Sequence, residues 1–88
     1  MEILINNQKI EVETRELVRI HIDEIGTLVG TVEAVTKDYM SLKNIIVLEP
    51  VNESTLLFQG SILFYSDEIK DISVIGQKCN VQPLKIAN

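Results

Sequence analysis

The sequence predicts an all-β fold, a small, strongly bent five-stranded antiparallel sheet or partly open barrel. Isoleucine and valine together make up 22 of the 88 residues, whereas alanine occurs only at Ala34 and Ala87. Such β-branched residues favour strands over helices. Apolar and polar residues alternate with a period of two, and turn residues interrupt this alternation at short intervals. Together these features predict several short strands with one buried face each.

The first two strands of the sheet are expected on either side of a glycine-containing bend. The first strand is expected at residues 17–23, where apolar and polar residues alternate from Val18 to Asp23, and a polar bend with Gly26 follows. A second strand is expected over residues 28–36. Gly30 lies inside it, and an interior glycine usually marks a sharp bend or a close approach of two backbones. The sheet is therefore expected to curl at Gly30.

Three further strands complete the expected sheet. The third covers residues 39–48 and ends before Pro50, which removes a donor from the ladder of hydrogen bonds. The fourth covers residues 55–65. A tight turn at residues 66–67 leads into the fifth strand, residues 69–75.

The last three strands carry apolar residues on both faces, although one small domain has a core for only one of them. Five strands also leave two edges with unpaired backbone groups, and neither edge is rich in lysine or proline, the usual protection against further pairing. We therefore expect a protein partner that adds a strand. An OB-fold or an SH3-like barrel would show the same outline, and a peptide-binding SH3-like barrel remains an alternative.

The residues before and after the sheet are expected to be appendages. A small hairpin is predicted in which residues 2–5 pair with residues 9–13 around a turn that includes Gln8. The pattern does not indicate how this hairpin joins the rest. The expected organisation is an N-terminal extension at residues 1–13, a domain at residues 14–76 and a C-terminal tail at residues 77–88.

The charge balance disfavours binding to nucleic acids and membranes. The chain has eight lysines and arginines and 13 acidic residues, which gives a net charge of −5, and the cations are spread along the whole chain. Such a surface repels phosphate backbones and anionic lipids. The chain has no apolar run near the roughly 20 residues of a membrane span, and no signal peptide is recognisable. The single cysteine, Cys79, fits a reducing compartment, so an intracellular protein is expected, cytoplasmic or nuclear.

No residue pattern indicates catalysis. His21 is the only histidine and reads as a surface residue of a strand, because catalysis also needs a nucleophile and an orienting partner. Cys79 has Lys78 beside it but no base to activate it. The sequence lacks a nucleophile elbow, a phosphate-binding loop and paired metal-ligand spacings. We expect no enzyme activity, cofactor, metal or small-molecule substrate.

Three segments resemble the two motifs of the Sm/LSm family: residues 30–35, residues 38–42 and residues 62–75. The resemblance covers roughly residues 14–76. It implies a bent five-stranded sheet whose fourth strand pairs with the fifth strand of a neighbouring subunit, building rings or dimers. Within the family the sequence looks most like the Sm-fold Gemins of the survival-of-motor-neuron complex. That likeness implies a scaffold subunit in the assembly of small nuclear ribonucleoproteins, and a heterodimer with another Sm-fold subunit.

The family's RNA-binding residues are largely replaced. The first motif of the family reads Asp-x-x-Met-Asn. An alignment on Met40 puts Lys37 at the aspartate, Tyr39 at the base-stacking position and Ser41 at the asparagine. This alignment needs one inserted residue, and without it the same three positions fall on Thr36, Asp38 and Met40. In the second motif, Tyr65-Ser66-Asp67 stands in place of Arg-Gly-Asn. A carboxylate in an acidic protein opposes binding to a uridine tract.

Two sets of site residues follow from the resemblance. If the protein is a scaffold, backbone pairing at the edge strands supplies the affinity and alternate side chains choose the partner. The alternative is an RNA-binding LSm ring subunit in RNA processing or decay, in which bases would stack on the tyrosines. The expected partner interface comprises Leu57, Gln59, Ser61, Leu63, Ile72, Ser73, Val74 and Ile75, and the disfavoured RNA contacts are Tyr39, Ser41, Tyr65 and Asp67.

Overall fold

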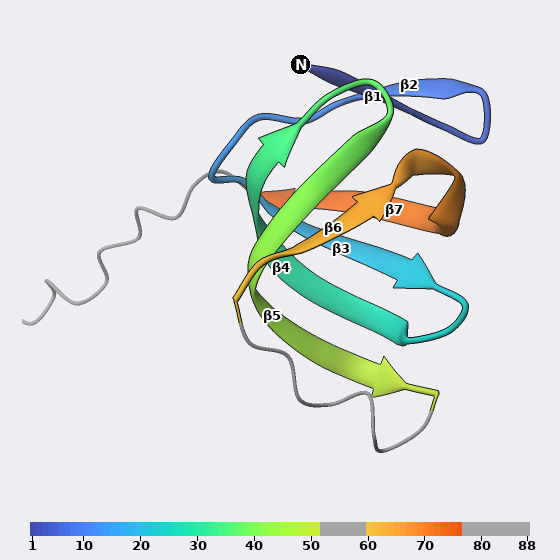
Figure 1. Ribbon diagram of the computed structural model, residues 1–88, viewed down its shortest axis with the longest axis vertical. Helices are drawn as coiled ribbons and strands as arrows, with labels where there is room; N and C mark the ends of the chain where they lie inside the picture. The colour runs from blue at the N-terminus through green and yellow to red at the C-terminus, as the bar shows by residue number, and fades with distance from the viewer. Residues whose placement is uncertain (52–59, 77–88) are drawn as a thin grey trace, which may run out of the picture.

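The computed structural model describes residues 1–51 and 60–76, which are mostly β-structure (Figure 1). A two-stranded sheet comes first in the chain, and a five-stranded sheet follows. The elements are β1 (Glu2–Ile5), β2 (Gln8–Glu11), β3 (Leu17–Ile22), β4 (Gly26–Val35), β5 (Tyr39–Pro50), β6 (Ile62–Tyr65), the 3₁₀ helix η2 (Ser66–Glu68) and β7 (Ile69–Gly76).

The five-stranded sheet has the order β6-β5-β4-β3-β7, and all neighbouring strands are antiparallel. The expected all-β class and the five-stranded antiparallel sheet are thereby confirmed. The sheet is not closed into a barrel, because β6 and β7 lie at its opposite ends in the order of pairing. Strands β6 and β7, which are separated in sequence only by η2, thus form the two edges of the sheet.

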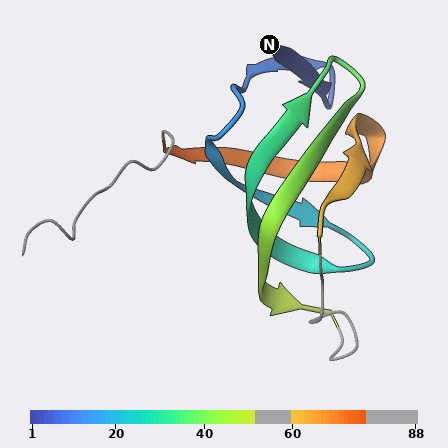
Figure 2. The ribbon, with the colours of Figure 1, turned by 60° about the vertical axis from the view of Figure 1, so that its left-hand side comes forward.

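The sheet curves where β4 pairs with β5 (Figure 2). Val29 pairs with Ile46 and Thr31 with Lys43, so two residues of β5 face the single residue Gly30 of β4. Bulges of this kind bend a strand and increase its twist. A Cβ atom on Gly30 would lie 3.1 Å from Leu42 Cβ. Gly30 therefore marks a close approach, as its place inside a strand predicts.

The core lies on one face of the sheet. Strand β3 directs Val18, Ile20 and Ile22 inward while Arg19 is exposed, as the alternation in the sequence predicts. The remaining buried apolar side chains come from the two-stranded sheet, from β4 to β6, from the start of β7 and from Val12 after β2. They are Ile3, Ile5, Val12, Leu28, Val32, Val35, Met40, Leu42, Phe64 and Ile69.

The N-terminal hairpin is tighter than the sequence suggests. Strands β1 and β2 pair in register from Glu2 opposite Glu11 to Ile5 opposite Gln8. The turn consists of Asn6 and Asn7 alone, which have positive φ angles of 52° and 66°. Asparagine tolerates this conformation, and two-residue hairpin turns require it. Gln8 therefore belongs to the second strand and not to the turn.

The hairpin packs onto the main sheet and contributes to its core. Ile3 and Val12 are fully buried, and Ile5 is 3% exposed. The Leu4 backbone N–H donates a hydrogen bond to the carbonyl oxygen of Lys37, in the turn between β4 and β5, at 3.1 Å. Residues 1–13 thus share one hydrophobic core with the five-stranded sheet.

Some boundaries differ from the sequence-based expectation. Strand β5 extends to Pro50, and β4 begins earlier, at Gly26. The described part of the fourth predicted strand starts only at Ile62, because Gly60 has a positive φ of 78° and lies, like Ser61, outside β6. The expected tight turn is a single turn of 3₁₀ helix. Residues 52–59 and the predicted tail, 77–88, lie outside the described residues.

Candidate functional site

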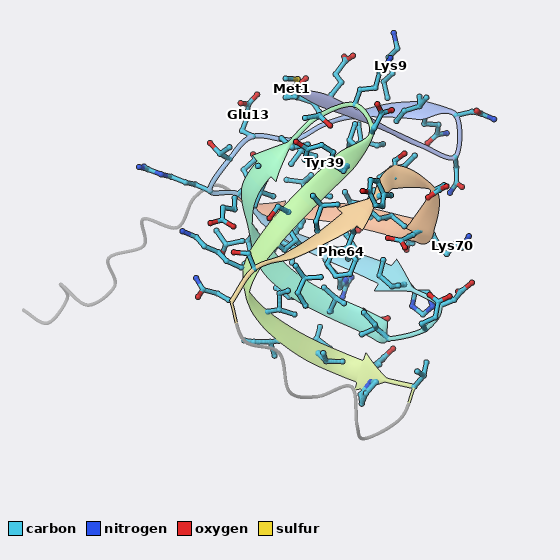
Figure 3. The ribbon with its side chains drawn as sticks, in the orientation of Figure 1. Met1, Lys9, Glu13, Tyr39, Phe64 and Lys70 are labelled. Carbon is cyan, nitrogen blue, oxygen red and sulfur yellow. The ribbon has the colours of Figure 1, made fainter. Side chains whose placement is uncertain are left out.

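The first candidate surface is the outer face of β5 and β6, opposite the core. In the register of these strands Tyr39 lies opposite Tyr65, and Ser41 opposite Leu63. The two tyrosine rings meet edge to face, with centroids 6.5 Å apart and planes at 81°. Phe64 points the other way and is buried beneath β6 (Figure 3). We call Tyr39, Ser41, Leu63 and Tyr65 together the tyrosine face.

Two members of the tyrosine face are strongly exposed. Tyr65 is 56% exposed and Leu63 is 43% exposed. Both come from β6, the edge strand, whereas Tyr39 and Ser41 come from β5 and are half-buried. An exposed aromatic and an exposed aliphatic side chain side by side are typical of a contact surface.

Carboxylates border the tyrosine face at two places. On the β4 side, Oε1 of Glu33 accepts hydrogen bonds from the hydroxyls of Ser41, at 3.4 Å, and Ser61. At the end of β6, Oε1 of Glu68 accepts a hydrogen bond from the Tyr65 backbone N–H at 3.0 Å. Asp67 is exposed on the same 3₁₀ helix. The surroundings of the two tyrosines are therefore acidic.

The residues considered for RNA contact lie close together. Tyr39, Ser41 and Tyr65 share one face through strand register, and Asp67 follows two residues after Tyr65. The Lys70 ammonium donates a hydrogen bond to the main-chain oxygen of Asp67 at 3.4 Å, and not to the Asp67 carboxylate. Aromatic rings suit base stacking, but phosphates need cations beside them. The geometry thus supplies stacking surfaces in an unfavourable electrostatic setting.

The second candidate surface is the β7 edge. Ile72 lies opposite the buried Ile20 and is half-buried, whereas Ser73 is exposed. Val74 lies opposite the fully buried Val18 but is itself 38% exposed, so the core side of the sheet is open at this end of β7. Ile75 is 50% exposed. Three of the four residues expected here to contact a partner are thus accessible.

The fourth-strand part of the expected interface is less complete. Leu63 lies on the edge strand β6 and is accessible, as an interface residue must be. Ser61 precedes β6, and its hydroxyl is engaged by Glu33 across the sheet. It is therefore not a residue of the edge strand, contrary to the expectation. Leu57 and Gln59 lie outside the described residues.

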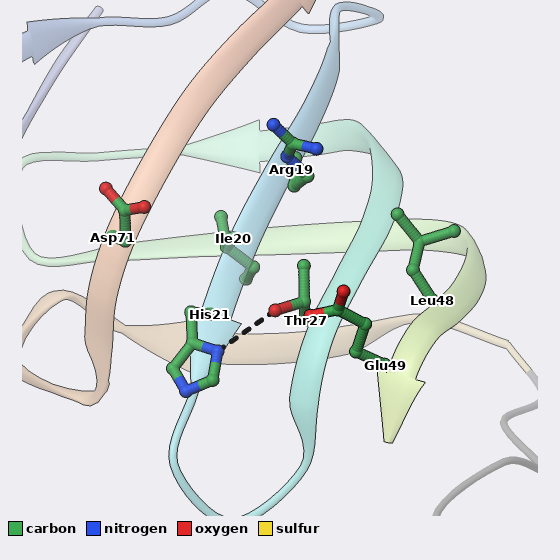
Figure 4. A pocket seen from close by; sticks show the side chains of 7 residues that line it. All are labelled: Arg19, Ile20, His21, Thr27, Leu48, Glu49 and Asp71. Atoms are coloured by element: carbon green, nitrogen blue, oxygen red, sulfur yellow. Dashed lines mark hydrogen bonds between the residues drawn. The ribbon is translucent and has the colours of Figure 1, made fainter. Parts of the chain in front are cut away.

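A shallow depression of about 290 Å³ lies on the outer face at the other end of the sheet (Figure 4). Four residues form a row across it in strand register: Glu49 on β5, Thr27 on β4, His21 on β3 and Asp71 on β7. His21 Nδ1 lies 3.1 Å from Thr27 Oγ1, within hydrogen-bonding distance. His21 Nε2 lies 3.6 Å from Oδ1 of Asp23.

Sequence reasoning did not bring Glu49 and Asp71 to His21, because only the pairing of distant strands places them in one row. His21 is paired with a threonine hydroxyl and stands in one row with two carboxylates. Among the described residues no group of three or more histidine, cysteine or acidic side chains could hold a metal ion.

The N-terminal hairpin carries an exposed ion-pair cluster. The Met1 ammonium donates hydrogen bonds to Oε2 of Glu11 at 2.9 Å and to Oε2 of Glu13 at 3.2 Å; Figure 3 shows Met1 and Glu13 at the same end of the molecule. These bonds raise the pKa of the amino group above its ordinary value. The hydrogen bond from the same ammonium lowers the pKa of Glu11. Both shifts arise in solvent and contribute little to stability.

Comparison with known proteins gives no relative from which a function could be carried over. No family model matches the chain, and no curated protein and no solved structure matches it significantly. In the part of the chain that the structure describes, no helix has the length and apolar character needed to cross a membrane.

Proposed function

We propose that this protein is a non-catalytic Sm-fold scaffold subunit that joins other Sm-fold subunits by pairing of edge strands, in the assembly of small nuclear ribonucleoproteins. The strand order carries the proposal. Strands β6 and β7 contain the second motif of the resemblance, and they are the two outer strands of the sheet. Pairing of a fourth strand with a neighbour's fifth strand requires this arrangement, because each subunit must offer one edge of each kind.

The exposed side chains support the same proposal. A strand added at an edge gains affinity from main-chain hydrogen bonds and specificity from alternate side chains. Leu63 on β6 and Ile75 on β7 are 43% and 50% exposed, and a neighbouring chain would remove both from water. Burial of an exposed aliphatic side chain contributes about 1 to 2 kcal/mol. One feature departs from the family: a β-hairpin occupies the place where a helix usually precedes the first strand.

A charge on either edge should weaken assembly. Leu63→Lys and Ile75→Lys should each shift the protein toward smaller species, because a lysine would have to be desolvated between two strands. The matched control is Leu4→Lys, since Leu4 is 40% exposed but lies on the hairpin. Light scattering over a concentration series measures the effect. A stable monomer at high protein concentration for the unmodified chain, or equal effects of all three substitutions, would contradict the proposal.

The partner can be identified by co-purification from the native host followed by mass measurement of the intact complex. The proposal requires a second protein with an Sm-type sheet, held through Leu63 or Ile75. Loss of that protein from the Leu63→Lys complex, with retention in the Leu4→Lys complex, would link it to the β6 edge. Recovery of the chain alone at its monomer mass would count against a scaffold role.

The tyrosine pair favours one second candidate, an RNA-binding LSm ring subunit. The two rings meet on an exposed face, where bases could stack. We nevertheless expect no micromolar binding of labelled oligo-U at moderate salt, because Glu33 and Asp67 border this face. Fluorescence anisotropy measures it. Clear binding that Tyr39→Ala abolishes would favour the RNA-binding subunit over the scaffold.

A further inference from the structure

The tyrosine face combines an aromatic platform with fixed carboxylates. The rings of Tyr39 and Tyr65 meet edge to face with their centroids 6.5 Å apart, and more than half of the Tyr65 side chain is exposed to solvent. An aromatic ring presents its negative face to a cation, and guanidinium groups stack on such rings more often than ammonium groups do. The exposed ring of Tyr65 is therefore a suitable platform for an arginine side chain.

Glu33 is held in place at one border of this platform. The hydroxyls of Ser41 and Ser61, which come from separate segments, both donate to its Oε1 atom. Both of these bonds are made to the same carboxylate oxygen. Two hydroxyl donors on one oxygen favour one orientation of this exposed carboxylate. A pre-oriented carboxylate suits the paired donors of a guanidinium group.

Charge also selects the kind of occupant. Asp67 and Glu68 lie at the opposite border of the tyrosine face from Glu33, and the whole chain has a net charge of −5. RNA would bring phosphates to this border, and a second copy of the chain would bring further acidic residues. A basic polypeptide segment is the occupant whose charge complements the surface.

We propose that the tyrosine face binds an arginine-containing basic segment of a partner protein, laid across the outer face of β5 and β6. One arginine stacks on Tyr65, a second pairs with Glu33 at the other border, and the part of the segment between them covers Leu63. This contact uses side chains of the outer face and no backbone groups of the edge. It therefore goes beyond the proposed scaffold role, and the two can fail separately.

The test is a titration of the full chain with labelled twelve-residue peptides that alternate threonine with arginine, lysine or glutamate, followed by fluorescence anisotropy. The arginine peptide should bind, the lysine peptide should bind several-fold more weakly, and the glutamate peptide should not bind. Tyr65→Ala should weaken the arginine complex about two- to fivefold, the magnitude of an exposed cation–π contact. Raising the salt concentration should weaken it further.

Matched variants separate a defined site from general charge attraction. Glu33→Gln and Glu24→Gln remove the same charge, but Glu24 is exposed in the turn between β3 and β4. Only Glu33→Gln should weaken binding markedly. Equal effects of the two substitutions, or no effect of Tyr65→Ala, would overturn the proposal, as would equal binding of the arginine and lysine peptides. Both variants leave the edge backbones unchanged, so light scattering reports on strand pairing independently.

Discussion

Gly26→Ala should destabilise the fold by about 3 kcal/mol or more, since overlap with backbone cannot relax as overlap with a side chain can. Gly26 begins β4 with a φ of 115°, a conformation that alanine rarely adopts. A Cβ atom there would lie 3.0 Å from Pro50 Cα and would overlap the carbonyl oxygen of Glu49. Urea unfolding followed by circular dichroism measures the loss.

The other glycines provide the controls for this prediction. Gly76 ends β7, and no atom lies within 4 Å of where its Cβ atom would be. Gly76→Ala should therefore change stability by no more than about 0.5 kcal/mol. Gly60 also has open space but a positive φ of 78°, so Gly60→Ala should cost about 1 to 2 kcal/mol from backbone strain alone. Equal unfolding midpoints for the Gly26 and Gly76 variants would show that β4 and β5 do not approach as described.

Ile3→Ala should lower the free energy of unfolding by about 2 to 4 kcal/mol, in the range found for truncation of buried aliphatic side chains. Ile3 is fully buried although it lies in the first strand of a hairpin at the end of the chain. The substitution leaves a cavity between the hairpin and the sheet. Thermal and urea unfolding, monitored at the same wavelength, measure the change.

Leu4→Ala is the control, because Leu4 is the next residue of the same strand and is 40% exposed. It should cost less than about 1 kcal/mol, as expected for a surface position. If both substitutions proved equally mild, the hairpin would not contribute to the core. If Leu4→Ala were the more damaging, the hairpin would face the sheet with its other side.

The sequence predicts burial where a strand alternates without interruption. Val18, Ile20 and Ile22 point inward as expected, because a period of two directly encodes which face meets the core. The same alternation in the hairpin does not reveal what its apolar face covers. Ile3 and Ile5 could only be placed once the pairing of distant segments was known. Long-range packing, not local pattern, decides that question.

The candidate site divides in a similar way. The family resemblance puts both Tyr39 and Tyr65 among the RNA-contact positions, and in the structure they are direct cross-strand neighbours. It gives no sign of Glu33. Alternation along β4 turns this side chain outward, but only the pairing of β4 with β5 brings it to Ser41. The acidic border of the tyrosine face was therefore out of reach of the sequence.

The hairpin also has a consequence for the order in which the molecule forms. The side-chain amide of Asn6 donates to the carbonyl oxygen of Lys70 at 3.3 Å, across 64 positions of the chain. When the ribosome has made only the first half of the protein, Lys70 has not yet been synthesised and Asn6 lacks this partner. The hairpin can therefore reach Lys37 early in synthesis, but its contact with Lys70 forms only after β7 has been made.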